Sequence, residues 1–486
     1  MPGRPLRVRP LAIGLAPFAA LALVRLSVFA EGDTFWGVRT GQQILATHSV
    51  HLRDDLSWTR FGVAWHPNEW GYDVALWVAY RLGGIAGLQV FLGITIVALG
   101  VVVVVAAHAF RVRLRDGYWV SLFLGPLLLG WLSARAQTVS YSFQLLELLL
   151  IARLFTARGL DVWRWGVALL VLQAVWLNIH EAAASGIVVA AGCAVVRGVS
   201  LLRRRELDVP SALRLAAAPG LVLVGSLCGP FGWSVFADSE RTRAASAGVI
   251  VEWDSVLHAP ATVLAELGVG VLLVALMVAV WRRERGSDLE ALSDVWLGAA
   301  IVLAAASLVV VRFVAPLLLV GIVAATAVTR ADRISQRLTS YRRLLDVGAA
   351  VVAALLTAVG VVQLTASGEP TAANFPSVRL LDAIPPRCVL LNEYDDGGWI
   401  SLQRGPALRV SQDGRNVLYG RALLGREQAL LDGRAGAAAL TDFGATCVLA
   451  KPDDAIVRDL AADPRWVLAA RDARRVLYER TAIADR

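Results

Sequence analysis

Eleven long apolar stretches constrain the fold of this chain more than any other feature. Most are close to the roughly 20 apolar residues that cross the hydrocarbon core of a bilayer. They predict an α-helical polytopic membrane protein with about eleven transmembrane helices, give or take one or two where the stretches are short. The stretches fall near residues 11–30, 86–108, 118–134, 137–155, 163–179, 182–199, 211–229, 261–281, 292–310, 312–329 and 344–366.

The composition agrees with a membrane protein. Of the 486 residues, 57% are hydrophobic, and the mean hydropathy is +0.60. The formal net charge is +8, and Lys451 is the only lysine, so almost every base is arginine. In a membrane protein such an excess first indicates cytoplasmic loops. Neither zinc-knuckle spacing nor the aromatic and basic pattern of an RNA-binding surface is present, so we expect no nucleic-acid partner.

The arginines also predict an orientation in the cell membrane. Cytoplasmic loops carry an excess of Lys and Arg, and here arginines cluster in every second turn between the apolar stretches. We therefore place the N-terminus in the cytoplasm, as the start of a retained first helix rather than a cleaved signal peptide. The eleventh helix then delivers the C-terminal region to the extracytoplasmic side. The inner segments are residues 4–9, 111–115, 153–164, 197–205, 282–285 and 330–343.

The C-terminal region has a different composition, with more charge, more turns and shorter apolar stretches. Its alternation of strand-like and helix-like segments predicts a small α/β domain of roughly 110 residues. We accordingly divide the chain into a transmembrane domain, 1–366, which carries an outer loop at 31–83, and an extracytoplasmic domain, 367–486. The predicted strands are 388–391, 407–410, 446–450, 466–469 and 475–478, and the predicted helices are 427–431 and 454–462.

The four cysteines fall into two pairs. Cys193 and Cys228 lie in apolar stretches and are predicted to be small core residues. Cys388 and Cys447 lie in the C-terminal region. If that region is outside the cytosol, a disulfide between them can form, although the sequence does not fix their separation.

The first candidate for chemistry is Glu31-Gly32-Asp33, directly after the first apolar stretch. A carboxylate at the outer membrane surface can act as a general base toward an acceptor hydroxyl. Such carboxylates can instead hold a divalent cation on a phosphate; the cofactor stays open, with Glu31 and Asp33 as its ligands if there is one. The structural alternative has even weight: Asp33 or Thr34 caps a helix, and Phe35 and Trp36 anchor that helix in the interface.

Further acidic and histidine side chains gather on the same predicted outer side. Polar groups near a membrane are costly and are usually functional or paired. For the loop around His66 and Glu69 we favour a site over a simple helix cap. For His180 and Glu181 a site and snorkelling at the interface have even weight, and the zinc-protease pattern HExxH is absent. Glu252 is a fifth candidate, in the loop after the seventh stretch.

Three arginines on the predicted outer side are candidates for a lipid phosphate. The guanidinium group matches phosphate oxygens geometrically, and Arg241, Arg243 and Arg312 lie in outer loops or turns. Arg135, at another outer turn, qualifies on the same argument. The structural alternative is a solvated face, which is usual for isolated arginines.

The order and placement of these segments resemble the polytopic GT-C type glycosyltransferases. The similarity is to a bacterial branch related to protein mannosyltransferases and lipid A aminoarabinose transferases. It spans most of the chain, with departures at Gly229, where relatives often have Asn, and at Ala136, where they often have Pro. The resembling segments are EGDTFWGVRTGQQIL, HPNEWGYDVALWVAYRLGG, NIHEAAASG, GPFGW with VEW, VVVRFVAP, LLNEYDDGGWISL and VSQDGRNVLYG.

The resemblance implies a function. GT-C enzymes carry a modified DxD motif in the first outer loop, and Glu31-Gly32-Asp33 matches its position, which implies Asp33 as the catalytic residue with Glu31 in support. It also implies a polyprenyl-phosphate sugar donor, an acceptor in the cell envelope on the outer face, and membrane lipids as surroundings. The remaining candidates would bind substrate: His66, Glu69, His180, Glu181, Arg241, Arg243, Glu252 and Arg312.

Two other functions stay open at this point. A lipid or sugar transporter, or a flippase, would concentrate polar groups at mid-depth in the membrane. Only Gln144, Glu147 and Gln173 fit that description, so we rank this function second. A non-catalytic envelope protein would bind glycan or a partner through its outer domain. The sequence does not identify the sugar, the acceptor or the oligomeric state.

Overall fold

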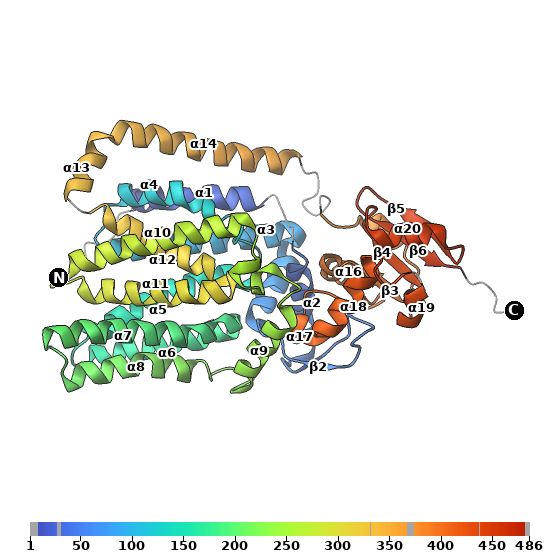
Figure 1. Ribbon diagram of the computed structural model, residues 1–486, viewed down its shortest axis with the longest axis horizontal. Helices are drawn as coiled ribbons and strands as arrows, with labels where there is room; N and C mark the ends of the chain where they lie inside the picture. The colour runs from blue at the N-terminus through green and yellow to red at the C-terminus, as the bar shows by residue number, and fades with distance from the viewer. Residues whose placement is uncertain (1–7, 27–30, 331, 367–373, 437, 482–486) are drawn as a thin grey trace. The chain divides into compact units, whose positions relative to one another are not determined.

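The chain forms two compact units in a computed structural model that describes residues 8–26, 31–330, 332–366, 374–436 and 438–481 (Figure 1). The helical unit contains the described residues of Met1–Ser27, Gln89–Phe236 and Val251–Leu364. The mixed unit contains those of Val28–Leu88, Ala237–Ile250 and Thr365–Arg486. Residues of the predicted outer loop thus pack together with C-terminal residues, and the domain border placed at residue 366 stays a prediction.

All eleven apolar stretches contain helix in the part of the chain that the structure describes. Eight helices there are long and apolar enough to cross a membrane, and Gly14–Leu26 and Val209–Gly225 are shorter apolar helices. The protein is therefore a multi-pass membrane protein. The helices that contribute to the helical unit are α1 (Val8–Leu26), α3 (Trp70–Ala109), α4 (Leu114–Leu124), α5 (Ala136–Thr156), α6 (Asp161–Ile179), α7 (Gly186–Arg204), α8 (Val209–Gly225), α10 (Ala261–Glu284), α11 (Glu290–Val309), α12 (Val314–Val328), α13 (Asp332–Ser340) and α14 (Arg342–Ala366).

Helices α11 and α12 form the interior of the helical unit, whereas α14 is peripheral. In the apolar segment Val311–Val328, which contains α12, 78% of the residues are buried. In the corresponding segment of α14 the share is 11%. A buried ion pair ties three helices together, because Asp294 on α11 accepts from Arg197 Nη1 of α7 at 2.9 Å and from Trp281 Nε1 of α10 at 2.7 Å. A carboxylate inside a membrane bundle needs such partners.

Small residues let α7 and α11 approach closely. A methyl group at Gly298 would lie 2.6 Å from Cys193 Cα and 2.7 Å from the carbonyl oxygen of Gly192. Small residues at helix crossings are typical of membrane bundles, where packing rather than the hydrophobic effect drives association.

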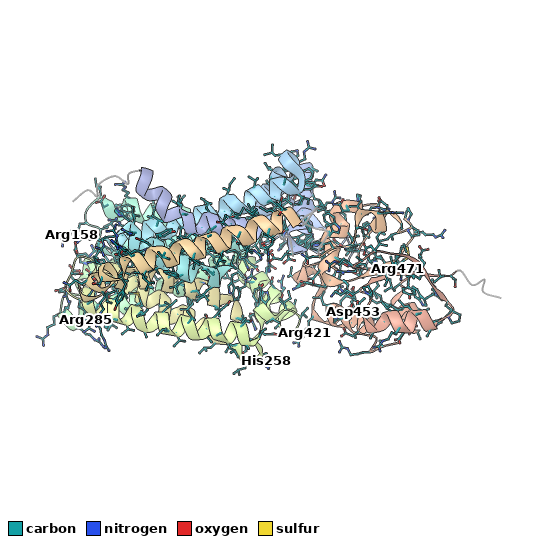
Figure 2. All side chains as sticks on the ribbon, turned by 90° about the horizontal axis from the view of Figure 1, so that it is seen from above. Arg158, His258, Arg285, Arg421, Asp453 and Arg471 are labelled. Atoms are coloured by element: carbon teal, nitrogen blue, oxygen red, sulfur yellow. A yellow bond between two sulfur atoms is a disulfide. The ribbon has the colours of Figure 1, made fainter. Side chains whose placement is uncertain are left out.

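Two arginines from different predicted inner segments lie at the same end of the helical unit (Figure 2). Figure 2 shows Arg158 and Arg285 at one end of the helical unit and His258 toward its other end. Arg158 and Arg285 belong to predicted inner segments, and His258 to a predicted outer loop. Which end faces the cytoplasm stays a prediction.

The mixed unit is built on a four-stranded sheet in the order β3-β4-β6-β5 (Figure 1). Strands β3 and β4 are parallel, and the other two pairs are antiparallel. Its strands are β1 (Leu52–Arg53), β2 (Ala64–Trp65), β3 (Leu390–Asn392), β4 (Cys447–Ala450), β5 (Trp466–Arg471) and β6 (Val476–Arg480). Its helices are α2 (Asp33–Thr47), the start of α3, most of α9 (Ser234–Ser246), α15 (Val378–Asp382), α16 (Gly397–Arg404), α17 (Asn416–Tyr419), α18 (Arg421–Leu431), α19 (Ala438–Phe443) and α20 (Ala455–Ala462).

Four of the five predicted C-terminal strands and both predicted helices are present, within one or two residues for the strands. The strand predicted at 407–410 is wrong. There the chain makes only an isolated bridge, between Val410 and Ser57, in which the backbone N–H of Val410 donates to Leu56. Leu408 and Val410 are buried and Ala407 and Arg409 are exposed, but the partner of the segment is a loop rather than a sheet edge.

The cysteine predictions have mixed outcomes. Cys388 and Cys447 form a disulfide that joins the segment before β3 to β4. Such a bond is stable in an oxidising compartment, in accord with the predicted extracytoplasmic location of this region. Cys193 is buried as predicted, but Cys228 is exposed, so the core prediction is wrong for that residue.

Helix α3 bends sharply at two adjacent glycines. Gly83 and Gly84 have non-helical dihedral angles inside α3, and Gly84 has a φ of +58°, which favours glycine. They separate a first segment, which belongs to the mixed unit, from the long apolar span, which belongs to the helical unit from Gln89 onward.

Candidate active site

Asp33 is the first residue of α2. The carbonyl oxygen of Gly32 accepts the first helical hydrogen bonds, and no side chain caps the helix. Asp33 Oδ1 instead accepts a hydrogen bond from Trp36 Nε1 at 3.0 Å. The predicted cap by Asp33 or Thr34 is therefore wrong, and the carboxylate is oriented by an aromatic donor one turn further along.

The aromatic residues of α2 are core residues rather than membrane anchors. Phe35 is fully buried and Trp36 is 5% exposed. The ring of Phe35 packs against Phe375 and Trp399 at centroid distances of 5.2 and 5.0 Å. The anchor interpretation is wrong because aromatic residues from the C-terminal region cover Phe35. These residues are more than 300 positions away in the sequence, so the residues around Phe35 could not indicate them.

Three glycines make the contact between α2 and the C-terminal residues very tight. A methyl group at Gly414 would lie 1.8 Å from Asp33 Oδ1, and one at Gly398 would lie 2.0 Å from the carbonyl oxygen of Gly32. One at Gly32 would lie 2.3 Å from the carbonyl oxygen of Asp395. No side chain fits at these positions, so backbone from the C-terminal region borders Asp33 directly. We call these three residues the glycine joint.

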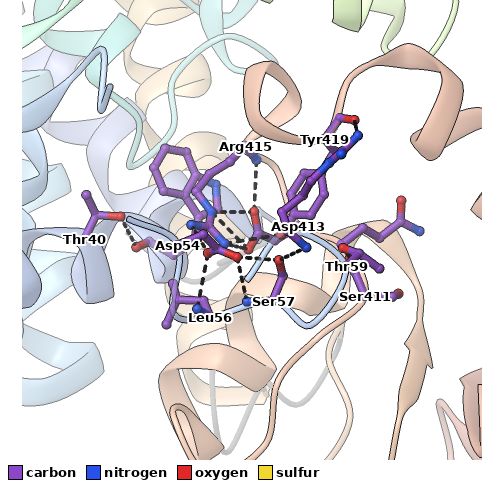
Figure 3. Close-up of polar contacts among 12 residues, drawn as sticks. Thr40, Asp54, Leu56, Ser57, Thr59, Ser411, Asp413, Arg415 and Tyr419 are labelled. Carbon is purple, nitrogen blue, oxygen red and sulfur yellow. Dashed lines mark hydrogen bonds and ion pairs between the residues drawn. The ribbon is translucent and has the colours of Figure 1, made fainter. Parts of the chain in front are cut away.

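A buried ion cluster fixes the turn that carries Gly414 (Figure 3). Arg415 donates from Nη1 to Asp54 Oδ1 at 2.8 Å and from Nη2 to Asp413 Oδ2 at 2.7 Å. It also donates to the hydroxyl of Tyr419 at 3.2 Å. Arg415 is 1% exposed and both carboxylates are 0% exposed. Removing one member of such a cluster leaves an uncompensated buried charge, so the geometry is strongly specified.

Asp73 was not predicted and packs against α2 beside Gly37. Its carboxylate is fully buried and accepts no hydrogen bond from any residue that the structure describes. A methyl group at Gly37 would lie 2.8 Å from Asp73 Oδ1, and one at Gly41 would lie 2.0 Å from its carbonyl oxygen. Glycines spaced four apart on α2 thus admit the start of α3. The one available signal was an acidic residue in a largely apolar stretch.

Three predicted site residues of the mixed unit are paired with acidic side chains of α9. His66 Nδ1 lies 3.1 Å from Asp238 Oδ2, and Arg241 Nη1 donates to Asp238 Oδ1 at 2.6 Å. Arg243 Nε donates to Glu240 at 2.8 Å. The two arginines are already neutralised by carboxylates three residues earlier, which weakens their case as phosphate ligands. Glu69 is half-buried, one turn before Asp73, and Glu31 is half-buried beside Gly32.

In the helical unit, Glu252 and Arg312 belong to one cluster. Arg135 Nη1 lies 3.2 Å from Glu252 Oε1, and the guanidinium of Arg312 lies 4.9 Å from the centroid of the Trp253 ring. Burial by itself would raise the pKa of Glu252, but the charges of Arg135 and Arg312 outweigh it and hold that pKa below its ordinary value. Arg312 makes no direct ion pair with a described carboxylate, and its charge acts on Glu252 at longer range.

His180 and Glu181 are buried, at 4% and 6% exposure, so the snorkelling interpretation is wrong. His180 Nδ1 lies 2.7 Å from Ser140 Oγ, which also accepts from Trp176 Nε1 at 2.9 Å. These contacts join α5, α6 and the turn that follows. They are those of a structural histidine, and the substrate-binding role of both residues stays a prediction.

A second carboxylate borders the catalytic candidate. Burial raises the pKa of Asp395, and the nearby negative charge of Asp33 raises it further. Among the described residues, no group of three or more His, Cys, Asp or Glu side chains is arranged to hold a metal ion. The divalent cation left open by the sequence therefore gains no support from this geometry, and we assign it no step.

The comparisons with known proteins bear on the fold. No protein-family model matches the sequence, and no curated protein matches it. Two solved structures of ArnT from Cupriavidus metallidurans are similar: one bound to undecaprenyl phosphate, with a TM-score of 0.59, and one in the apo state, with a TM-score of 0.53. Each is 15% identical, and each alignment covers 98% of this chain and 98% of that chain. ArnT is a GT-C aminoarabinose transferase, so this chain has a GT-C type fold, as the resemblance in its sequence indicates.

Proposed function

We propose that this protein is a membrane glycosyltransferase of GT-C type. It transfers a sugar from a polyprenyl-phosphate donor to an acceptor hydroxyl in the cell envelope, on the extracytoplasmic side. The observation that carries the proposal is the setting of Asp33: an oriented carboxylate at the start of a helix, bordered by backbone from a distant part of the chain. The shared fold with an ArnT that was solved with undecaprenyl phosphate supports the donor class.

In this mechanism Asp33 is the general base. It accepts the proton of the acceptor hydroxyl while that oxygen attacks the anomeric carbon of the donor sugar. The bond between the anomeric carbon and the phosphate oxygen breaks, and the polyprenyl phosphate leaves with the bonding electrons. The hydrogen bond from Trp36 Nε1 to Asp33 Oδ1 holds the carboxylate in one orientation.

Positive charge stabilises the leaving phosphate in this mechanism. Guanidinium groups aimed at developing negative charge are an effective form of transition-state stabilisation. Arg312 is the best supported candidate, because it makes no direct ion pair with a described carboxylate, whereas Arg241 and Arg243 are each paired with a carboxylate of their own helix. His66, Glu69, His180, Glu181 and Glu252 remain candidates for shaping the substrate cavity.

The test is transfer of label from a radiolabelled polyprenyl-phosphate sugar pool in membranes. Wild type, Asp33→Asn and the matched control Asp442→Asn would be compared at equal protein amounts. Asp442 is exposed on α19. We expect loss of transfer by a factor of 10² or more in Asp33→Asn, as for other general bases, and no loss in the control.

Two outcomes would contradict the proposal. Full activity of Asp33→Asn would show that the base lies elsewhere. Absence of labelled product with wild type, when the donors are shown to be present, would shift the weight to the transporter or binding-protein alternatives.

A further inference from the structure

The mixed unit has a polar hollow of about 550 Å³. This volume lies within the range of roughly 300–1,000 Å³ that small ligands occupy. Its walls come from three separate turns. Asp395 belongs to the turn after β3, Lys451 and Asp453 follow β4, and Arg474 and Arg475 form the connection between β5 and β6. Asp453 is labelled in Figure 2.

The wall between β5 and β6 is fixed by buried bonds. Arg475 Nη2 donates to Asp396 Oδ1 at 2.7 Å, and Asp396 is fully buried. The backbone N–H groups of Arg474 and Arg475 both donate to Asp472 Oδ1, at 2.7 and 2.8 Å. The backbone that carries the Arg474 guanidinium is therefore held in a rigid turn. Binding a ligand there costs less conformational entropy of the protein than binding to a flexible loop would.

The charged groups around the hollow are of both signs. The carboxylates of Asp395 and Asp453 and the guanidinium of Arg474 make no hydrogen bond or ion pair with another described side chain. A carboxylate only accepts and a guanidinium only donates, whereas a sugar hydroxyl does both. Acceptors and donors placed together suit adjacent hydroxyls on one ring better than they suit a simple anion or cation.

The hollow is also connected to the catalytic candidate. Asp395 lines it, and the carbonyl oxygen of the same residue contacts Gly32 in the glycine joint. The charge of Asp33 raises the pKa of Asp395, so the two carboxylates sense each other. A ligand that contacts Asp395 in the hollow thus lies next to the segment that carries the proposed base.

We propose that this hollow is the acceptor subsite and that it binds a neutral saccharide unit of the acceptor through Asp395, Asp453 and Arg474. This inference rests on the proposed glycosyltransferase function and adds the chemical class of the acceptor. The acceptor hydroxyl gives its proton to Asp33 and its oxygen to the anomeric carbon, while the donor's bond to phosphate breaks. Asp395 and Arg474 orient that saccharide and take no part in the proton transfer.

The first experiment measures binding without turnover. The purified full-length protein in detergent is titrated with glucose, galactose, mannose, rhamnose, arabinose and N-acetylglucosamine, with saturation-transfer-difference NMR as readout. Asp395→Asn and Arg474→Ala are compared with the controls Asp442→Asn and Arg471→Ala; Arg471 is exposed on β5 and is not among the residues that line the hollow. Each hollow variant should weaken binding of the preferred sugar about tenfold, the usual effect of one charge-assisted hydrogen bond. The controls should bind as wild type does.

Three results would overturn this inference. One is that no sugar binds, and another is that all variants bind equally well. The third is that inorganic phosphate displaces the sugar and itself binds in an Arg474-dependent way without any preference for neutral sugars. Thermal unfolding of each variant identifies a fold defect, and Asp453→Asn then serves as a second hollow variant at an exposed position.

A second experiment separates this inference from the proposed function. In the transfer assay, Arg474→Ala should raise the acceptor KM about tenfold with kcat kept, and Asp33→Asn should lose transfer but still bind the sugar. Transfer without sugar binding would refute the subsite alone. Sugar binding without transfer by wild type would refute the proposed function, and with it the acceptor role of the hollow.

Discussion

Gly414→Ala is the sharpest test of the glycine joint. The added methyl group would lie 1.8 Å from Asp33 Oδ1 and 2.7 Å from Trp36 Nε1, whereas ordinary contacts to a Cβ atom begin at 3.4 Å. The carboxylate or the turn at Gly414 must therefore move by more than an ångström. The turn is held by the buried Arg415 cluster, so we expect Asp33 to move and its bond from Trp36 to be lost.

The expected loss of activity is much larger than the loss of stability. Misplacing a catalytic group by about 1 Å costs on the order of 10²-fold in rate. Overpacking a close contact costs about 1–3 kcal/mol, which the mixed unit should survive. We therefore expect the kcat of sugar transfer to fall about a hundredfold, while the protein still folds and still binds the hollow's sugar.

Gly425→Ala is the matched control, because a methyl group at that position on α18 meets nothing within 4 Å. Alanine is favoured over glycine inside a helix by up to about 1 kcal/mol, so this variant should be as stable as wild type or slightly more stable, with unchanged activity. Transfer assays and thermal unfolding in detergent measure both effects. Unimpaired kcat in Gly414→Ala would refute the view that this contact positions Asp33.

Two further predictions concern the stability of the mixed unit. Arg415→Met should destabilise it by about 3–5 kcal/mol, because Asp54 and Asp413 would stay buried without a counter-charge. The control Arg434→Ala breaks an exposed pair with Asp432 and should cost less than about 1 kcal/mol. Equal melting temperatures of the two variants would contradict this prediction. Burial raises the pKa of Glu427 from 4.5 to about 8, so the folded state keeps a proton that the unfolded state loses, and stability falls as the pH rises through that window. Glu427→Gln should remove this loss of stability, which is on the order of a few kcal/mol. The thermal midpoint of the variant should match that of wild type near pH 5 and exceed it near pH 8. If the midpoints of both proteins change in parallel with pH, Glu427 is not the cause.

The helices were predictable because their signal is local. An apolar stretch of membrane length must satisfy its own backbone hydrogen bonds, so its length and composition determine its structure. The C-terminal alternation of strands and helices was predictable for the same reason. The segment 407–410 was predicted as a strand by the same argument, but its partner is a loop more than 300 residues away. Its own composition does not distinguish pairing with a sheet from pairing with a loop.

The surroundings of Asp33 were not predictable because they are distant in sequence. Arg415 and Asp54 are 361 residues apart, and a single sequence contains no sign that they pair. The partners of Arg241 and Arg243 could have been found, since Asp238 and Glu240 each lie three residues earlier, the spacing at which helical side chains meet. Asp73 is an acidic residue in a largely apolar helix, but its burial could not be predicted from its neighbours. The glycines that make room for it belong to another helix.

This distribution of contacts bears on the alternative of a non-catalytic envelope protein with a separable binding domain. Trp36, Leu52 and Trp65 share one hydrophobic core with Leu418 and Tyr419, so the C-terminal residues complete a core that the first outer loop begins. The glycine joint and the Arg415 cluster are likewise made of both segments. A binding domain that acted alone would have no need to place its backbone against Asp33, whereas an enzyme that holds its base in one orientation requires such a contact. This packing argues against a separable binding domain, and in the proposed mechanism it makes the C-terminal residues part of the active site.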